Sequence, residues 1–293
     1  MCPICQGLAG HYLDYQKIGK GDYQLLRCYN CRLIFTVPLP AVDFLRDFYQ
    51  HYDSIGQTDN YYRNIKNYRR QVVGRKLINH FHRLNDQYHF RRDLRLLDLG
   101  SGGGMFLDIV KQAGFSGLGV EISAPATKFA RENFAVECLT ADVSSVDFEE
   151  QFGAVFMWDL LEHLSQPQQL LGRINNWLAP GGYLVIETPD SRALINQLII
   201  WLLKIGIRWP ASWMFGYHHL YWHSQQSLAF LLAQNNFKIL AVERFNTEPA
   251  RIFPWSWKFW GPRLVLGLVN GWAALIGRHN KLLIIAQKYE EQS

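Results

Sequence analysis

The stretch LLDLGSGGGMFL, residues 96–107, begins as a buried β-strand and turns at a run of glycines. Glycines directly after a strand allow a tight turn and let backbone amides approach a ligand, with a helix N-terminus beyond. The dinucleotide fingerprint GxGxxG needs a third glycine where this chain has Met105. Asp98 stands two residues before the first glycine, where its carboxylate would repel a pyrophosphate and attract an ammonium group. The loop therefore predicts a nucleotide-binding sheet whose ligand carries positive charge.

Outward from this loop, short apolar runs alternate with helical stretches from about Leu94 onward. That alternation is typical of parallel strands joined by crossover helices. We therefore predict an α/β fold with a Rossmann-like, doubly wound sheet. The predicted strands are 95–99, 117–121, 136–140, 154–158, 183–187, 238–243 and 281–287. The predicted helices are 104–113, 125–133, 168–178 and 227–234.

Two further acids stand where the next two predicted strands end. Glu121 follows the second strand, where it can accept hydrogen bonds from both hydroxyls of a ribose. Asp142 follows the third strand and is placed to accept from an adenine amino group. Three acids at three successive strand ends indicate a nucleoside site more strongly than one glycine loop does. The alternative is an unrelated doubly wound domain in which these acids cap helices.

From about Leu94 to Lys288 the sequence resembles the class I S-adenosylmethionine-dependent methyltransferases. The glycine loop and its acids carry this resemblance, which continues through WDLLEHL at 158–164, LAPGGY at 178–183 and HLYWHS at 219–224. It implies a seven-stranded class I methyltransferase sheet with S-adenosylmethionine as the cofactor. One departure is Gly153, because relatives usually carry an aspartate at the start of the fourth strand.

The resemblance also implies cofactor contacts residue by residue. The methionine moiety is expected at the glycine loop, the ribose after the second strand, and the adenine after the third. The end of the fourth strand is expected beside the cofactor. The residues implied are Asp98, Gly100, Ser101, Gly102, Gly104, Glu121, Ile122, Asp142, Val143, Trp158 and Asp159.

Methyl transfer from a sulfonium needs alignment, a dry pocket and, for a protonated nucleophile, a base. Histidine suits the base role because its unperturbed pKa is about 6.5. His219 is the first candidate, since we expect it where a substrate-facing segment meets the carboxyl edge of the sheet. His163 is the second candidate. The alternative is that His163 holds its own loop through hydrogen bonds. Glu162 would then be a solvated or structural carboxylate.

Four of the five cysteines form two CxxC pairs, Cys2 with Cys5 and Cys28 with Cys31, separated by 22 residues. Two such knuckles facing each other complete a tetrahedral site of four sulfurs, the closed geometry of structural zinc. We therefore predict a zinc-ribbon-like region over residues 1–60. A disulfide pair in an exported protein and chance spacing are the alternatives. Cys138 is predicted to be a small buried hydrophobic residue.

Two hydrophobic insertions, 191–216 and 246–280, interrupt the predicted methyltransferase domain of residues 95–293. Their apolar segments, 192–209 and 253–276, combine tryptophans with lysine and arginine but are too short to span a bilayer. That pattern favours a helix lying in a membrane interface. The alternative is a lid over the active site or a face of a homodimer.

A basic segment, residues 61–94, is predicted to be a helical linker or lid. From 61 to 95 the chain has ten lysines and arginines against two acids, which suits a solvated helix face or contact with an anionic lipid or substrate. We expect no specific nucleic-acid partner, because the net charge is only +5 and no RNA-binding module is visible. The first residues show no basic and apolar leader, so we expect a cytoplasmic protein that could associate with a membrane.

These patterns predict a methyltransferase acting on a small-molecule or lipid-like acceptor, with methylation on oxygen, carbon or nitrogen left open. With its cysteine ribbon the chain is similar to bacterial methyltransferases that modify small molecules, sugars or lipids. A second class is a catalytically idle binding protein that keeps this fold as a scaffold at a membrane. A third, an NAD-dependent oxidoreductase, is disfavoured by Met105 in the glycine loop.

Overall fold

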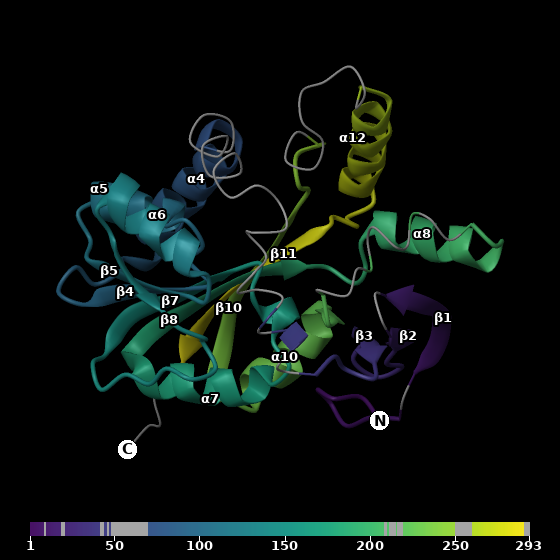
Figure 1. Cartoon of the computed structure of the whole chain (residues 1–293), viewed down its shortest axis with the longest axis horizontal. Coiled ribbons are helices and arrows are strands. Elements are labelled where there is room, and N and C mark those ends of the chain that lie inside the picture. Colours follow the sequence, from purple (N-terminus) through teal and green to yellow (C-terminus); the bar gives the residue numbers. More distant parts are fainter. Residues whose placement is uncertain are drawn as a thin grey trace. The chain divides into compact units, whose positions relative to one another are not determined.

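The computed structural model describes residues 1–8, 10–18, 21–41, 44–45, 47, 70–207, 210, 215, 219–249 and 260–289. The chain forms two compact units (Figure 1). We call the first the cysteine unit; it comprises Met1–Ala41, Asp159–Gln168 and Ile186–Ala286. We call the second the glycine-loop unit; it comprises Val42–Trp158, Gln169–Val185 and Gln287–Ser293.

A seven-stranded sheet has the order β10-β11-β8-β7-β4-β5-β6. Strand β4 pairs in parallel with both β5 and β7, and β5 pairs in parallel with β6. The order reverses beside β4, which is the point at which doubly wound sheets bind their ligands. The predicted Rossmann-like fold is therefore confirmed.

The glycine-loop unit contains most of the crossover helices. Its elements are α4 (Arg70–Tyr88), β4 (Arg95–Leu99), α5 (Met105–Gln112), β5 (Gly117–Glu121), α6 (Ala124–Phe134), β6 (Glu137–Thr140), β7 (Phe152–Trp158) and α7 (Pro167–Trp177, which begins in the other unit). Four of the five residues of β4 are buried, as the apolar run in the sequence predicts. Helix α4 lies in the predicted basic segment.

Strand β8 (Leu178–Pro189) differs from its prediction because it begins before the Pro-Gly-Gly turn rather than at residue 183. The side chains of the last strand hold this early part. Gln287 Nε2 donates to the carbonyl of Gly181 at 2.9 Å, and Lys288 Nζ donates to that of Leu178 at 2.8 Å. These long-range hydrogen bonds satisfy a backbone that the local sequence marks as a turn.

The cysteine unit is built around a second, four-stranded sheet with the order β1-β2-β3-β9. Its elements are β1 (His11–Ile18), β2 (Gly21–Arg27), β3 (Ile34–Val37), η2 (Leu161–His163), α8 (Leu194–Lys204), β9 (Tyr221–Trp222), α10 (Gln225–Ala233), β10 (Phe237–Phe245), α12 (Trp260–Leu275) and β11 (Lys281–Lys288, whose end passes into the other unit). Strand β9 pairs antiparallel with β3. Strand β9, which follows β3 by more than 180 residues in the sequence, thus completes the sheet of the cysteine ribbon.

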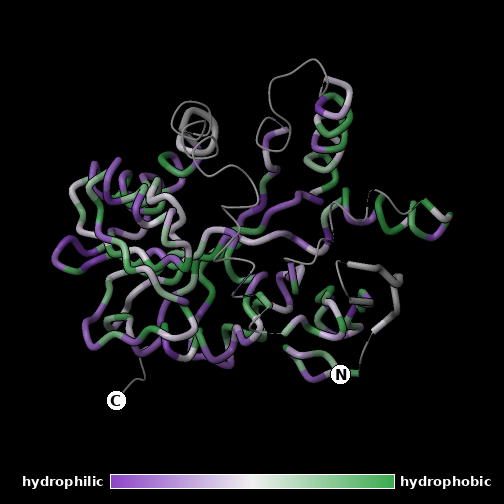
Figure 2. Tube along the Cα trace, viewed as in Figure 1, coloured by the Kyte–Doolittle hydropathy of each residue, from purple (hydrophilic) through white to green (hydrophobic). Residues whose placement is uncertain are grey.

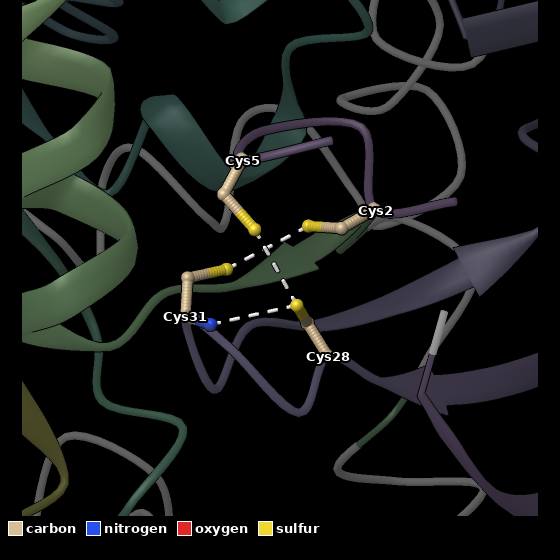
Figure 3. Close-up of side chains that lie close together, drawn as sticks. All are labelled: Cys2, Cys5, Cys28 and Cys31. Carbon is tan, nitrogen blue, oxygen red and sulfur yellow. Dashed lines mark hydrogen bonds between the residues drawn. The ribbon is translucent and has the colours of Figure 1, made fainter. Parts of the chain in front are cut away.

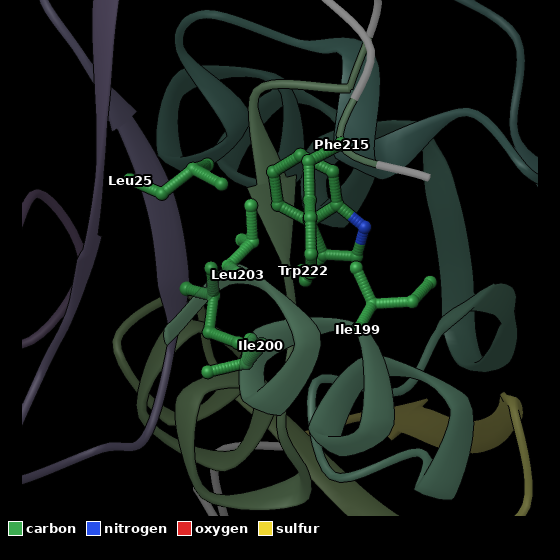
Figure 4. Close-up of a cluster of buried hydrophobic side chains, with 7 residues drawn as sticks. Leu25, Ile199, Ile200, Leu203, Phe215 and Trp222 are labelled. Atoms are coloured by element: carbon green, nitrogen blue, oxygen red, sulfur yellow. The ribbon is translucent and has the colours of Figure 1, made fainter. Parts of the chain in front are cut away.

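A buried apolar cluster joins this small sheet to α8 (Figure 4). Phe215 and Trp222 lie against each other edge to face, with ring centroids 4.9 Å apart. The other members come from β2, β3 and the inner face of α8: Leu25, Ile34, Ile199, Ile200 and Leu203. The cluster explains how so short a ribbon obtains a core, since four strands alone bury too little apolar surface.

Helices α8 and α12 fall in the two hydrophobic insertions and contact each other. Hydrophobic residues dominate both (Figure 2). Among the described residues, no helix has both the length and the hydropathy needed to cross a bilayer. The remaining parts of the insertions, including most of 208–218 and 250–259, lie outside the described residues.

Candidate active site

The glycine loop, Gly100–Gly104, leaves the end of β4 and leads into α5. The backbone amides of Gly100 and Ser101 donate to the carbonyl of Val120, at 2.8 and 3.1 Å, which fixes the loop to β5. Gly102 and Gly104 have φ angles of 52° and 76°, so both positions favour glycine. A Cβ on Gly104 would also lie 2.6 Å from that of Ala130, so the helices can pack closely only around this glycine.

Asp98 lies on β4 directly before this loop and is almost fully buried. Its Oδ1 atom has no hydrogen-bond partner among the described residues. Burial, and next the negative charge of Glu121, raise the pKa of the Asp98 carboxyl well above its ordinary value. A buried carboxyl with an unsatisfied oxygen is costly unless a positive group or donor meets it. This position therefore suits a cationic ligand.

The other two predicted acids are oriented by backbone amides. Glu121 accepts from the amides of Gly102 and Ser123, each at 2.9 Å, so one oxygen faces each segment. Asp142 accepts from the amide and the hydroxyl of Ser144. Carboxylates are acceptors, the group type that binds a ligand's hydroxyl or amino group. Each acid stands at the end of its own strand, as the sequence predicts.

The remaining predicted contacts lie at the same strand ends of the glycine-loop unit. Trp158 closes β7, with its ring nearly parallel to that of Phe156 and edge to face with Phe106. Val143 is buried and Ile122 is half-buried. The Ser101 hydroxyl lies 3.3 Å from the thiol of Cys138, so this cysteine, buried as predicted, also supports the loop.

Polar groups of the cysteine unit lie around η2. Asp159, which has a φ angle of 54°, forms an ion pair with Lys281 at the start of β11. The Lys281 ammonium is also 3.9 Å from the carboxylate of the buried Glu187. The sequence predicted a cofactor contact for Asp159; the structure adds a fixed cation that orients its carboxylate.

Glu162, His163 and His219 form a second group, which we call the Glu–His–His cluster. One nitrogen or oxygen from each residue lies within 4.8 Å of the others, which is close enough for the three to hold a divalent ion together. The two imidazole rings meet edge to face with centroids 4.7 Å apart. The amide of Leu220 donates to the carbonyl of Glu162 at 2.8 Å, so the two segments are tied by their backbones. Both predicted catalytic histidines are thus brought together.

Glu162 itself is fully buried, which excludes the solvated alternative for this residue. Its Oε2 accepts from the Thr188 hydroxyl at 3.0 Å, while its Oε1 has no partner in the described part of the chain. Burial, and then the charge of Asp159, raise its pKa to about 8. Glu162 can therefore take up or release a proton near neutral pH.

A family model described as a methyltransferase domain matches residues 67–242, which is more than half of the chain. The chain belongs to the class I S-adenosylmethionine-dependent methyltransferases. A curated relative of this methyltransferase is the ubiquinone biosynthesis O-methyltransferase of Caulobacter sp. (strain K31), 28% identical over 130 residues. That match covers 41% of this chain and 49% of the relative, so the chain spans about half the relative's length.

A longer match is to the ubiquinone biosynthesis O-methyltransferase of Roseobacter denitrificans, 26% identical over 61% of this chain and 73% of that protein. Among solved structures, magnesium protoporphyrin IX methyltransferase from Synechocystis PCC 6803 superposes with a TM-score of 0.54 and 15% identity, covering 84% of this chain and 98% of that one. A methyltransferase from Archaeoglobus fulgidus superposes with a TM-score of 0.51 and 22% identity, covering 78% of this chain and 99% of that one. These structural likenesses show the fold.

The glycine loop and the three acids at the strand ends fit S-adenosylmethionine. The buried oxygen of Asp98, which has no partner among the described residues, suits its positively charged methionine part, and Glu121 and Asp142 place acceptor groups at the next two strand ends. A Cβ added at Gly102 would have no atom of the described residues within 4 Å, so these residues leave space for a ligand beside the loop backbone.

The cysteine cluster of the methyltransferase, Cys2, Cys5, Cys28 and Cys31, also comes together (Figure 3). The sulfurs of Cys2 and Cys31 are 3.6 Å apart, and those of Cys5 and Cys28 are 3.5 Å apart. Both distances are too long for a disulfide and near the edge of about 3.8 Å expected for a tetrahedron with metal–sulfur bonds of about 2.3 Å. A hydrogen bond with Cys31 lowers the pKa of the Cys2 thiol to about 5, while the same hydrogen bond raises the pKa of Cys31 and burial raises that of Cys28, so without a metal one thiolate is favoured. Thiolate is the metal-binding form.

Sequence reasoning missed two features of the polar groups around η2. One is Lys281, which pairs with Asp159 across 122 positions of the chain. The other is the burial of Glu162. A lysine opening an otherwise apolar strand, KLLIIA at 281–286, was an available signal, because a buried lysine needs an acid nearby. The sequence offers no signal for which acid that is.

Proposed function

We propose that the protein transfers a methyl group from S-adenosylmethionine to a small-molecule or lipid-like acceptor. The observation that carries the proposal is the buried, unpartnered carboxyl oxygen of Asp98 beside the glycine loop. The family match supports the reaction type. The names of the curated relatives favour an oxygen atom of a small molecule as the methyl acceptor.

In this mechanism the bound cofactor supplies a methyl group already activated by its sulfonium. The protein contributes binding and alignment. Asp98 holds the positive methionine end, Glu121 the ribose and Asp142 the adenine. Trp158, fixed by two aromatic neighbours, supplies an apolar wall at the end of β7.

We assign acceptance of the proton to the Glu–His–His cluster. A hydroxyl or amine loses its proton as it attacks a methyl group, and an imidazole at the attacking atom accepts it. His219 is the proposed base. Glu162, with a pKa of about 8, lies within 4.8 Å of the imidazole, so its charge would influence how readily His219 takes up that proton near neutral pH.

The reaction is tested by incubating the purified protein with S-adenosylmethionine labelled on its methyl group and with extracts of small molecules and lipids. Transfer of label to an extract component, absent with Asp98→Asn, supports the proposal. Cofactor binding without transfer to any extract would instead indicate the idle scaffold.

Replacing His219 with alanine should lower kcat by about 10²- to 10⁴-fold, the range that a general base contributes. The affinity for S-adenosylmethionine should not change, because its proposed contacts are on other residues. Steady-state kinetics and calorimetric titration measure the two quantities. His82→Ala, which removes an exposed imidazole on α4, is the matched control. Undiminished turnover in His219→Ala would exclude this residue from the mechanism.

We propose that the cysteine cluster holds a structural zinc ion. Four sulfur ligands close the coordination shell, leaving no position for a substrate. The site would therefore stabilise the fold of the cysteine unit without taking part in methyl transfer.

A further inference from the structure

Helix α12 carries a stripe of exposed apolar side chains with a spacing of four residues. Residues four apart lie on one face of a helix, so the stripe runs along its whole length. Trp260 is 70% exposed and Trp272 is 68% exposed, values far above those of ordinary tryptophans in a folded protein. The stripe consists of Trp260, Leu264, Leu268, Trp272 and, just after the helix, Ile276.

Helix α8, which contacts α12, has a similar outer face. Its inner residues Ile199, Ile200 and Leu203 pack in the cluster of Figure 4. Its outer residues Leu198 and Trp201, and Ile205 directly after the helix, are spaced three and four apart and remain exposed. We call the stripe on α12 and this face of α8 together the apolar surface. Exposed apolar side chains gathered on two helices that contact each other indicate an interaction site.

The charged residues around the apolar surface are mostly basic; an exception is the buried Asp190, which forms an ion pair with Arg244 and accepts from the Arg192 amide. The sequence contains no aspartate or glutamate from 191 to 242 or from 249 to 289, which are the regions that include both helices. Arg192 and Arg278 stand where the two helices approach, since the amide of Leu194 donates to the carbonyl of Arg278 at 3.0 Å. Burial, and then the charges of Arg32, Arg278 and Arg192, lower the pKa of Arg27. These four arginines therefore form one positive group beside the helices.

We propose that the apolar surface and its arginines dock the protein on the face of a bilayer that contains anionic lipid. Tryptophans and leucines on one side of a helix, with arginine and lysine alongside, are typical of helices that lie in the membrane interface. Their apolar side chains enter the boundary of the acyl chains, and the arginines meet the headgroups.

A second copy of the chain fits the apolar surface less well. A twofold dimer would bring the same face of each copy together. The exposed arginines of one copy would then approach those of the other, and the nearby Asp190 is buried and already paired with Arg244. An anionic bilayer meets the same charge with attraction.

Flotation with vesicles tests the proposal, comparing phosphatidylcholine alone with phosphatidylcholine mixed with phosphatidylglycerol. The parent protein should float with the mixed vesicles and less with the neutral ones. In the triple variant Trp260→Ser, Leu268→Ser and Trp272→Ser, partitioning onto the mixed vesicles should fall by about tenfold or more. Arg192→Gln with Arg278→Gln should lose about fivefold per charge on mixed vesicles and little on neutral ones.

The matched control is Phe230→Ser with Leu240→Ser, which removes two exposed apolar side chains from α10 and β10, away from the apolar surface. It should float like the parent. Thermal melting and cofactor titration establish that each variant is folded. Equal flotation of the parent and the triple variant overturns the proposal. A parent that does not float but forms a dimer, lost in the triple variant, also overturns it and assigns the surface to a second copy.

Discussion

Asp98→Asn should weaken the binding of S-adenosylmethionine by on the order of a hundredfold or more, because truncating one partner of a buried charge pair costs about 2–5 kcal/mol. Asparagine has the same shape and keeps one acceptor oxygen, so the change removes charge rather than packing. Titration calorimetry of the parent and the variant measures the loss. Equal affinities would contradict the assignment of Asp98 to the cationic end of the cofactor.

The pH dependence of this binding has a defined sign. Burial raises the pKa of Asp98 in the free protein, so its carboxyl holds a proton at pH values where an ordinary aspartate is charged. A cationic ligand favours the charged form, so binding should release this proton and tighten as the pH rises toward the raised pKa. Calorimetry in two buffers of different ionisation enthalpy measures the released proton. Asp98→Asn should abolish that release.

The stability of the same variant separates lost binding from misfolding. A carboxyl whose folded pKa is raised binds more protons when folded, so its contribution to stability falls as the pH rises above its ordinary value of 3.8. Asp98→Asn removes that loss. The variant should therefore be at least as stable as the ligand-free parent at neutral pH, as thermal melting would show, although it binds the cofactor poorly.

The sequence predicted the sheet well because its signals are local. Apolar runs followed by glycines or acids placed β4, β5 and β6 within a residue of their observed bounds. Asp98 was identified as a candidate from its position two residues before the glycine loop. Neither inference needs knowledge of a distant segment, since the strand, the turn and the helix N-terminus follow one another in the chain.

Features that depend on distant segments could not be predicted in this way. The pairing of Ile34 with Trp222 decides where His219 is held, and nothing in the short strand YW specifies its partner. The burial of Glu162 likewise depends on elements far along the chain, including Thr188 and the segment at Leu220. The local sequence around Glu162 would be the same whether its carboxyl were exposed or buried. The pKa of the carboxyl and its possible role in proton transfer depend on which of the two holds.

The connection between the cysteine cluster and the histidines leads to a second large effect. The Thr36 amide, on β3, donates to the carbonyl of Leu220 at 3.1 Å, next to His219. The carbonyl of Cys31 accepts from the Ser224 hydroxyl at 2.5 Å, just beyond β9. Gln168 Nε2 donates to the carbonyl of Pro3 at 2.7 Å, beside the first cysteine knuckle. Within the cysteine unit, the ribbon therefore positions the segment that carries the proposed base.

Cys28→Ser with Cys31→Ser should remove the proposed zinc ion and reduce turnover to background, while the affinity for S-adenosylmethionine changes little. Structural zinc contributes about 10–16 kcal/mol in small domains, so the ribbon should not stay folded without it. Metal analysis, limited proteolysis of residues 1–41 and cofactor titration measure the three effects. Cys138→Ser is the control for metal content and proteolysis alone, because this cysteine lies outside the cluster but contacts the glycine loop. Full turnover in a metal-free double variant would show that the ribbon does not position His219.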